Sequence, residues 1–287
     1  MAKMDKEAFL QPSSSTHLGV ADFSHRGLVR ENNEDNILVK SFRTVEAKPR
    51  SILLAILADG VGGHQAGEIA SCIAVDSIAA RVQSSQNLDH PDLLLEEAFI
   101  AANQEIVAQS QNDEGKKGMG TTCVSALIIG RKLYLANIGD SRLYLLRNRE
   151  IRQLTFDHTW MEELSEAGFS GGTKISRSHP LAHVLNRYLG STEPIQVDLR
   201  IRFSGAETAE EMQNLQGMNL EAGDILLLNS DGISDLLTDE EIKENLLKRN
   251  WDQSAKRLVY CALKQGGHDN ASVIVIRVPA NLKKKKT

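Results

Sequence analysis

The stretch of sequence that decides the fold runs from residue 121 to residue 154, with the sequence TTCVSALIIGRKLYLANIGDSRLYLLRNREIRQL. Aliphatic and aromatic runs alternate in it with the pairs Gly-Arg, Gly-Asp and Asn-Arg, which are typical of tight hairpin turns. The pattern predicts four successive strands, at residues 121–129, 132–137, 142–147 and 150–154. Because links this short join only antiparallel neighbours, the stretch predicts an antiparallel sheet.

The remaining segments predict two groups of strands with two helices following each group. Runs of β-branched and aliphatic residues predict strands at residues 17–23, 37–42, 51–58, 195–203, 224–229 and 271–278. Apolar residues spaced three and four apart predict helices at residues 67–82, 91–110, 238–248 and 252–265. This order favours an α/β layered sandwich over a parallel doubly wound sheet, whose strands need longer crossovers.

A chain of 287 residues is long enough for one large domain, and no stretch of this sequence resembles an internal linker. We expect a disordered lead-in at residues 1–15, the domain at residues 16–280, and a basic, solvated tail at residues 281–287. Residues 155–190 are predicted to form an irregular excursion over one end of the domain, and residues 204–219 an exposed insertion.

Composition argues against several classes of partner. The formal net charge of −5 gives no basic footprint for nucleic acid. No apolar run is long enough to span a membrane, and the polar N-terminal residues lack the core of a signal peptide. The three cysteines lie far apart, which argues against a disulfide framework and favours a cytoplasmic location.

Carboxylates at the ends of the predicted strands are the informative residues. They occupy five places along the chain: Glu34 with Asp35, Asp59, Asp140, Asp231 with Asp235, and Asp269. Any one of these taken alone is most simply a turn or surface residue. Their recurrence at five strand ends instead predicts that packing of the strands brings them to one edge of the sheets.

A cluster of this kind is suited to binding hard cations. Neighbouring carboxylates repel one another unless cations neutralise them, and oxygen-only ligands select Mg²⁺ or Mn²⁺ over Zn²⁺. Two such ions about 4 Å apart acidify a bridging water and clamp a phosphoryl group. The carbonyl of Gly60 is a further candidate ligand, because a glycine lets the backbone approach an ion closely. Arg30 offers a bidentate contact to phosphate oxygens.

Seven segments carry a resemblance to a known family. They are GLVRENNED at residues 27–35, ADGVGGH at 58–64, MGTT at 119–122, NIGDSR at 137–142, LTFDH at 154–158, SDGISD at 230–235 and GHDN at 267–270. In this order they resemble the type 2C metal-dependent serine/threonine protein phosphatases, and most closely the compact bacterial branch, over about residues 17–278.

The resemblance implies a central β-sandwich of two antiparallel sheets flanked by α-helices on both outer faces. It implies that Asp59 bridges two ions and that Asp231 and Asp269 complete one site. Glu34 and the Gly60 carbonyl would serve the other ion.

The same resemblance implies roles for further residues. Asp35 would lie close to the second ion, and Arg30 would hold the substrate phosphate. Asp140 and Asp235, together with Asp231, match a third and weaker ion site. Residues 155–190 would be the flap beside the catalytic cleft.

The activity implied is hydrolysis of phosphoserine and phosphothreonine in proteins, by a water that bridges two Mg²⁺ or Mn²⁺ ions. The expected partners are phosphorylated proteins and a cognate serine/threonine kinase, and the expected state is a monomer. No cysteine is followed six positions later by arginine and no Asp-x-Asp motif occurs, so phosphatases with a cysteine or aspartate nucleophile fit poorly.

Two alternatives stay open from the sequence. One is a regulatory phosphatase of the same fold that acts on a single dedicated partner, such as an anti-sigma-factor antagonist. The other is a metal-sensing binding module that keeps the acidic site without turnover. One departure concerns proton transfer: Val61 stands where eukaryotic members carry a proton-donating histidine, and His64 is the nearest substitute.

Overall fold

Two antiparallel sheets form the centre of the protein. The computed structural model describes residues 9–61, 66–166 and 184–279. Sheet A contains, in spatial order, β1 Leu10–Pro12, β3 Asp35–Thr44, β4 Ser51–Val61, β6 Cys123–Ile129, β7 Lys132–Ile138 and β10 Met218–Asn219, with the short β5 Gly120–Thr121 beside β4. Sheet B contains β2 Gly19–His25, β12 Ala271–Arg277, β11 Ile225–Asn229, β8 Arg142–Arg147 and β9 Glu150–Gln153. The meander predicted from residues 121–154 is confirmed, although its last two strands lie in the opposite sheet from its first two.

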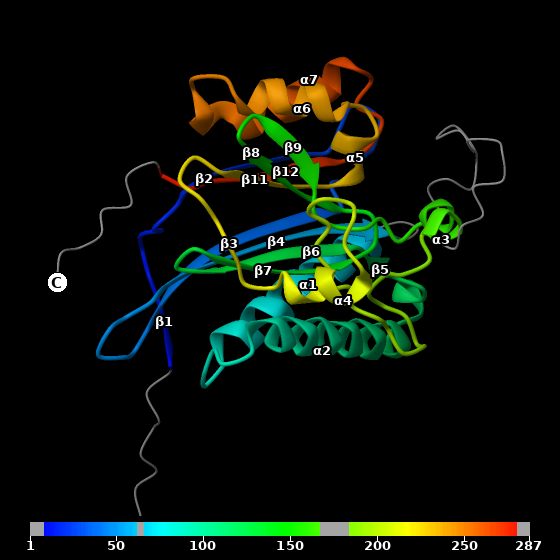
Figure 1. Ribbon diagram of the computed structural model, residues 1–287. Helices are drawn as coiled ribbons and strands as arrows, with labels where there is room; N and C mark the ends of the chain where they lie inside the picture. Colours follow the sequence, from blue (N-terminus) through cyan, green and yellow to red (C-terminus); the bar gives the residue numbers. More distant parts are fainter. Residues whose placement is uncertain (1–8, 62–65, 167–183, 280–287) are drawn as a thin grey trace, which may run out of the picture.

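Helices cover both outer faces of the sandwich (Figure 1). α1 Ala66–Gln83 and α2 Pro91–Asn112 pack on sheet A, and α6 Asp239–Leu246 and α7 Ser254–Lys264 pack on sheet B. The shorter pieces are α3 Trp160–Glu166, α4 Ala209–Asn214, α5 Asp231–Ser234 and the 3₁₀ turns Glu114–Lys116 and Trp251–Gln253. The predicted fold class, a β-sandwich between helical layers, is therefore confirmed. None of the helices in the described ranges is both long and apolar enough to cross a membrane.

Strand β4 shows why its sequence is an unbroken apolar run. Leu54 and Ile56 face the helices α1 and α2, whereas Leu53 and Leu57 face sheet B, and all four are fully buried. A strand buried on both faces loses the usual alternation of polar and apolar residues. The run therefore predicted the strand correctly but did not show which residues face sheet B.

The strand predicted at residues 195–203 is wrong. Only Asp198 of this segment pairs with β7, through a single bridge to Asn137. The side-chain amide of Gln216 occupies the neighbouring backbone groups, donating to the carbonyl of Leu135 at 2.7 Å and accepting from its N–H at 3.1 Å. Beyond Gln216, β10 pairs with β7 at Leu133. Gln216 and β10 therefore take the hydrogen-bonding positions along β7 that a strand at residues 195–203 would have used.

Two further expectations need correction. Residues 204–219 are not an exposed insertion throughout, because Leu215 and Met218 pack against the layer between the sheets, and Thr208 and Glu211 form a capping box that starts α4. Within the lead-in expected at residues 1–15, Leu10 is fully buried and β1 pairs with the end of β3. Residues 1–8 and the tail at residues 281–287 lie outside the described residues.

Candidate metal centre

The layer between the two sheets changes from apolar to polar at one end of the sandwich. Along β4 its inward face carries Leu53, Ala55 and Leu57 and then Asp59, because side chains alternate along a strand. The inward faces of the neighbouring strands end likewise in buried polar residues, namely Asp35, Thr122, Asn137, Ser230, Ser272 and Asn270. The apolar layer therefore holds the sheets together and leaves one polar edge.

Strand register brings the predicted carboxylates to this edge. Asp35 on β3 is directly opposite Asp59 on β4. Asp231 follows the end of β11 and begins α5, while Asp269 stands two residues before β12, the neighbour of β11 in sheet B. Asp140 lies in the turn from β7 to β8, where the chain passes from sheet A to sheet B.

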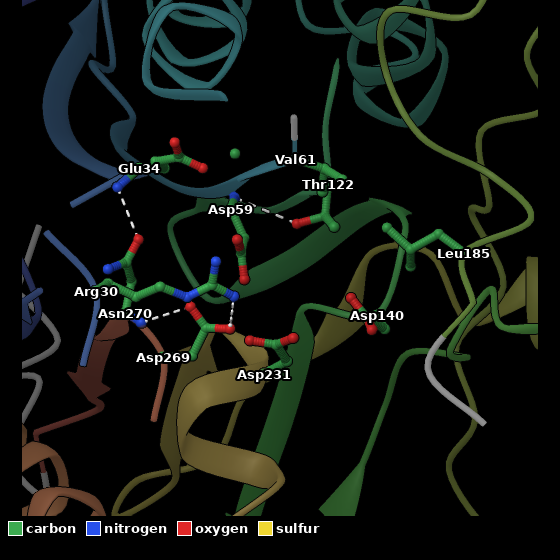
Figure 2. Close-up of a pocket in the computed structure, with 11 residues that line it drawn as sticks. Arg30, Glu34, Asp59, Val61, Thr122, Asp140, Leu185, Asp231, Asp269 and Asn270 are labelled. Atoms are coloured by element: carbon green, nitrogen blue, oxygen red, sulfur yellow. Dashed lines mark hydrogen bonds and ion pairs between the residues drawn. The ribbon is translucent and has the colours of Figure 1, made fainter. Parts of the chain in front are cut away.

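A pocket of about 310 Å³ opens where these elements meet (Figure 2). It is lined by Arg30, Glu34, Asp59, Gly60, Val61, Thr122, Asp140, Leu185, Asp231, Asp269 and Asn270. Seven of the nine predicted site residues are in this lining. The other two, Asp35 and Asp235, are not part of the lining. Asp35 is buried and accepts a hydrogen bond from the Ser230 hydroxyl at 2.8 Å, and Asp235 is near enough to Asp140 and Asp231 to affect their pKa values.

Burial and mutual repulsion make the ionised forms of these acids unfavourable. Burial raises the pKa of Asp35 to about 6 and that of Asp140 to about 7. The pKa values of Asp59 and Asp231 are raised well above the ordinary value, first by burial and then by the neighbouring carboxylates. Carboxylates in this condition either bind protons or require nearby cations.

The donor set fits hard divalent cations. Its members are carboxylate oxygens and backbone carbonyls, and one oxygen each of Asp35 and Asp231 is buried without a hydrogen-bond partner in the described structure. Within the described ranges, however, no three His, Cys, Asp or Glu side chains already stand in an arrangement that holds one ion.

Arg30 reaches the pocket from the loop before β3. Its Nη2 donates to Asp269 Oδ2 at 2.6 Å, and its side chain remains 56% exposed. The loop is fixed by Gly27, which has a positive φ of 80° and where a Cβ would lie 2.2 Å from the carbonyl oxygen of Asp269. The Leu28 N–H also donates to the carbonyl of Gly267 at 2.8 Å. Arg30 is thereby held beside the acids.

Two residues that line the pocket received no role from the sequence. Thr122 Oγ1 accepts a hydrogen bond from the Asp59 N–H at 3.3 Å. Asn270 Oδ1 accepts from the Glu34 N–H at 2.8 Å, and its Nδ2 donates to two carbonyls of the loop that carries Arg30. Both residues occur in quoted motifs, but their contacts join segments far apart in the sequence. Their motif positions were the only available indication.

A buried histidine supports the turn that carries Asp140. His158 accepts the Gly139 N–H at its Nδ1 at 3.0 Å, so that its Nε2 is the protonated nitrogen and donates to Asp198 at 3.2 Å. Asp198 is also bonded by the guanidinium of Arg200, and these contacts hold its pKa below the usual range despite burial. His158 and Asp198 thus fix the backbone next to Asp140.

Comparison with known proteins decides the family. Residues 20–166, about half of the chain, match the model described as Protein phosphatase 2C. The chain belongs to this family. The serine/threonine phosphatase stp of Listeria monocytogenes is 32% identical over 255 residues, which cover 88% of this chain and 92% of that protein.

Other phosphatase 2C relatives include the serine/threonine protein phosphatase PstP of Mycobacterium tuberculosis. It is 38% identical over 257 residues, which make up 89% of this chain but only 44% of the length of PstP. The crystal structure of the catalytic domain of PstP in complex with two manganese ions has a TM-score of 0.71 and 37% identity, covering 91% of this chain and 98% of that one. The family assignment agrees with the resemblance carried by the seven motifs.

Val61 and His64 are the two residues at or near the position of the proton donor. Val61 lines the pocket and is 42% exposed, and its side chain carries no proton to donate. His64 and residues 167–183 of the predicted flap lie outside the described residues. The described part of the flap contains α3 and a bridge between Thr159 and Leu185.

The raised carboxylate pKa values predict how the stability of the metal-free protein depends on pH. An acid whose pKa is higher in the folded protein than in the unfolded chain stabilises the fold at low pH and loses this contribution as pH rises through the folded pKa. Lowering the pH from 8 to 6 should therefore raise the melting temperature in chelator by at least about 3 °C, because Asp140 and then Asp35 take up protons.

Thermal unfolding with excess chelator and with saturating Mn²⁺, each across this pH range, measures the effect. His17, which is partly buried, has a lowered pKa, so it acts in the opposite direction but is the same in both series. The rise in melting temperature caused by Mn²⁺ should be largest at pH 8. A metal-free melting temperature that is flat or falls between pH 8 and 6 would contradict the prediction.

Proposed function

We propose that this protein hydrolyses phosphoserine and phosphothreonine in proteins, with two divalent cations held by the carboxylates at the polar edge of the sandwich. The observation that carries the proposal is the pocket at the polar edge of the sandwich. Five carboxylates and one arginine line it, and Asp59 and Asp231 among them have raised pKa values. A negatively charged pocket attracts an anionic phosphate group only if cations occupy it first.

We assign the ligands on the basis of this pocket and of the family motifs. Asp59 would contact both ions, Asp231 and Asp269 would complete one site, and Glu34 with the Gly60 carbonyl would serve the other. Two observations support the place of Gly60. Its Cβ, if present, would lie 2.4 Å from the backbone of Gly67 and 2.8 Å from the Glu34 carbonyl, so only glycine brings this backbone so close to Glu34.

Asp35, Asp140 and Asp235 would act around these ions. Asp35 is directly opposite Asp59 and has one unpaired buried oxygen, which supports a place close to the second ion. We assign a third and weaker ion to Asp140 and Asp235 together with Asp231. The mutual effects of these three acids on their pKa values support this grouping.

The chain's own residues would bind and orient the substrate. When bound, the ions supply Lewis acidity, which acidifies a water and neutralises charge on the phosphoryl group. Arg30 would direct its guanidinium to two phosphate oxygens at the exposed side of the pocket. Thr122 keeps the backbone of Asp59 fixed, and Asn270 keeps the Glu34 and Arg30 loop in place.

The biological setting is proposed more broadly. We infer that the enzyme opposes a serine/threonine kinase in the cytoplasm, as a monomer, and uses Mg²⁺ or Mn²⁺. The support is the name of its relatives as serine/threonine phosphatases and the absence of paired cysteines, since all three are free thiols. We also propose that residues 10–280 form one catalytic domain, which includes β1, with residues 155–190 as its flap.

A metal-dependence assay tests the proposed function. Hydrolysis of p-nitrophenyl phosphate and of a phosphothreonine peptide should require added Mn²⁺ or Mg²⁺ and cease in excess EDTA. Zn²⁺ should not restore it, because every proposed ligand is an oxygen atom. Full activity in excess chelator would contradict the two-ion assignment. Mn²⁺ binding without turnover of either substrate would instead support the metal-sensing module.

A further inference from the structure

Several exposed large apolar residues belong to, or directly adjoin, the segments that line the acidic pocket. We define the apolar rim as Leu28, Val29, Val61, Trp160 and Val184, which are 65%, 64%, 42%, 37% and 45% exposed. Single exposed aliphatic residues are ordinary on protein surfaces. Here five of the eleven large apolar residues exposed in the described ranges fall within two positions of a pocket-lining residue or hydrogen-bond to such a segment. Their grouping therefore calls for an explanation.

Leu28 and Val29 form the rim on the side of Arg30 and Asp269. They are the two residues before Arg30, and the Leu28 N–H is bonded to Gly267, two residues before Asp269. Arg30 is itself bonded to Asp269. The two side chains therefore belong to the loop that carries Arg30, the residue proposed to bind the phosphate. Both are exposed and lie outside the hydrophobic core.

Trp160 and Val184 form the rim on the other side. The Trp160 N–H donates to the carbonyl of Val184 at 3.0 Å, and the next residue, Leu185, bridges to Thr159 and lines the pocket. Figure 2 shows Arg30 and Leu185 at opposite ends of the pocket, with Asp59 and Asp231 between them. Val61, which also lines the pocket, lies towards a third side.

A phosphorylated residue bound in the pocket must direct its chain neighbours across this rim. Each residue of an extended chain advances about 3.3 Å, so the neighbours within about three positions lie nearest to the mouth. Contact with exposed leucine, valine and tryptophan removes apolar surface from water only if those neighbours are apolar too. A charged neighbour would instead lose hydration without gaining a partner.

Resting on the proposed function, we propose that the apolar rim selects phosphoprotein segments with aliphatic or aromatic residues within about three positions on either side of the phosphorylated residue. The pocket supplies recognition of the phosphate, which every substrate shares. The apolar rim discriminates between substrates by the residues that flank the phosphorylated one. p-Nitrophenyl phosphate has no flanking residues, so it reports on the pocket alone.

The test compares the variants Leu28→Ser and Val184→Ser with the matched control Val45→Ser. Val45 is 43% exposed, close to Val184 at 45%, and follows β3 at the end away from the pocket. Two phosphothreonine peptides are used, one flanked by leucine and valine and one flanked by serine.

Leu28→Ser should raise KM for the apolar peptide about tenfold, as expected for losing burial of a leucine, with kcat unchanged. It should leave the serine-flanked peptide and p-nitrophenyl phosphate unaffected, and Val45→Ser should change nothing. If the wild type had equal KM values for both peptides and hydrolysed p-nitrophenyl phosphate normally, the proposed role of the apolar rim would be overturned and the proposed function would stand. No hydrolysis of any substrate with Mn²⁺ would overturn the proposed function and the rim together.

Discussion

Replacing Asp59 with asparagine should cause the largest loss of activity of any single carboxylate substitution, about a thousandfold or more. Asp59 lies between the other acids at the inner end of β4, and it is the residue assigned to both ions. Asparagine has the same shape but no charge, so the fold is kept while both ions lose a ligand. The same substitution should raise the melting temperature of the metal-free protein, because it removes one of several mutually repelling buried charges.

Calorimetric titration with Mn²⁺ tests the assignment directly. Asp59→Asn should bind neither of the two tight ions with wild-type affinity, whereas Asp235→Ala should bind both and turn over more slowly. Asp224→Asn is the matched control, since Asp224 is 2% exposed and paired with Arg147 far from the pocket. It should lower stability without altering ion binding. Two ions bound by Asp59→Asn at wild-type affinity would show that Asp59 does not bridge them.

The sequence predicted those elements whose stability is local or repetitive. The meander at residues 121–154 was predicted well because its turns and apolar runs are each decided by adjacent residues. The strand expected at residues 195–203 failed because the side chain of Gln216 and β10 occupy the edge of β7 instead. Which segment pairs with a sheet edge depends on residues far apart in sequence, so the local pattern of apolar residues does not predict it. β1 is a similar case, since its three residues pair with the end of β3, about thirty positions away in sequence.

More of the candidate site than of the surrounding fold was predicted from the sequence. Carboxylates at strand ends identified five lining residues, because strand ends from two facing sheets must meet at one edge, and the segments around them added Arg30 and Gly60. The sequence did not indicate that Asp35 is buried beside Asp59 and outside the pocket lining, which follows from their direct pairing between β3 and β4 and from the hydrogen bond to Ser230. His158 and Asp198 were missed for the same reason. Their contacts join a turn, a buried ring and a distant loop, and neither residue stands at a strand end.

Arg30→Ala should raise KM for both p-nitrophenyl phosphate and a phosphothreonine peptide, by roughly a hundredfold, because a charged bidentate contact to phosphate contributes a few kcal/mol in a partly dehydrated site. The turnover number should fall less than KM rises, since Arg30 would bind the phosphate before as well as during the reaction. The KM of Arg30→Lys should lie between those of Arg30→Ala and the wild type, because lysine keeps the charge and loses the planar pair of donors.

Mn²⁺ binding separates this role of Arg30 from a role in building the metal centre. Arg30 Nη2 now donates to Asp269 Oδ2 at 2.6 Å, and Asp269 is one of the proposed ligands. Removing the guanidinium frees that carboxylate, so calorimetric titration of Arg30→Ala should give Mn²⁺ affinities equal to or higher than those of the wild type. If the affinities fall instead and KM recovers at higher Mn²⁺ concentrations, Arg30 serves to position Asp269, and another group must bind the phosphate.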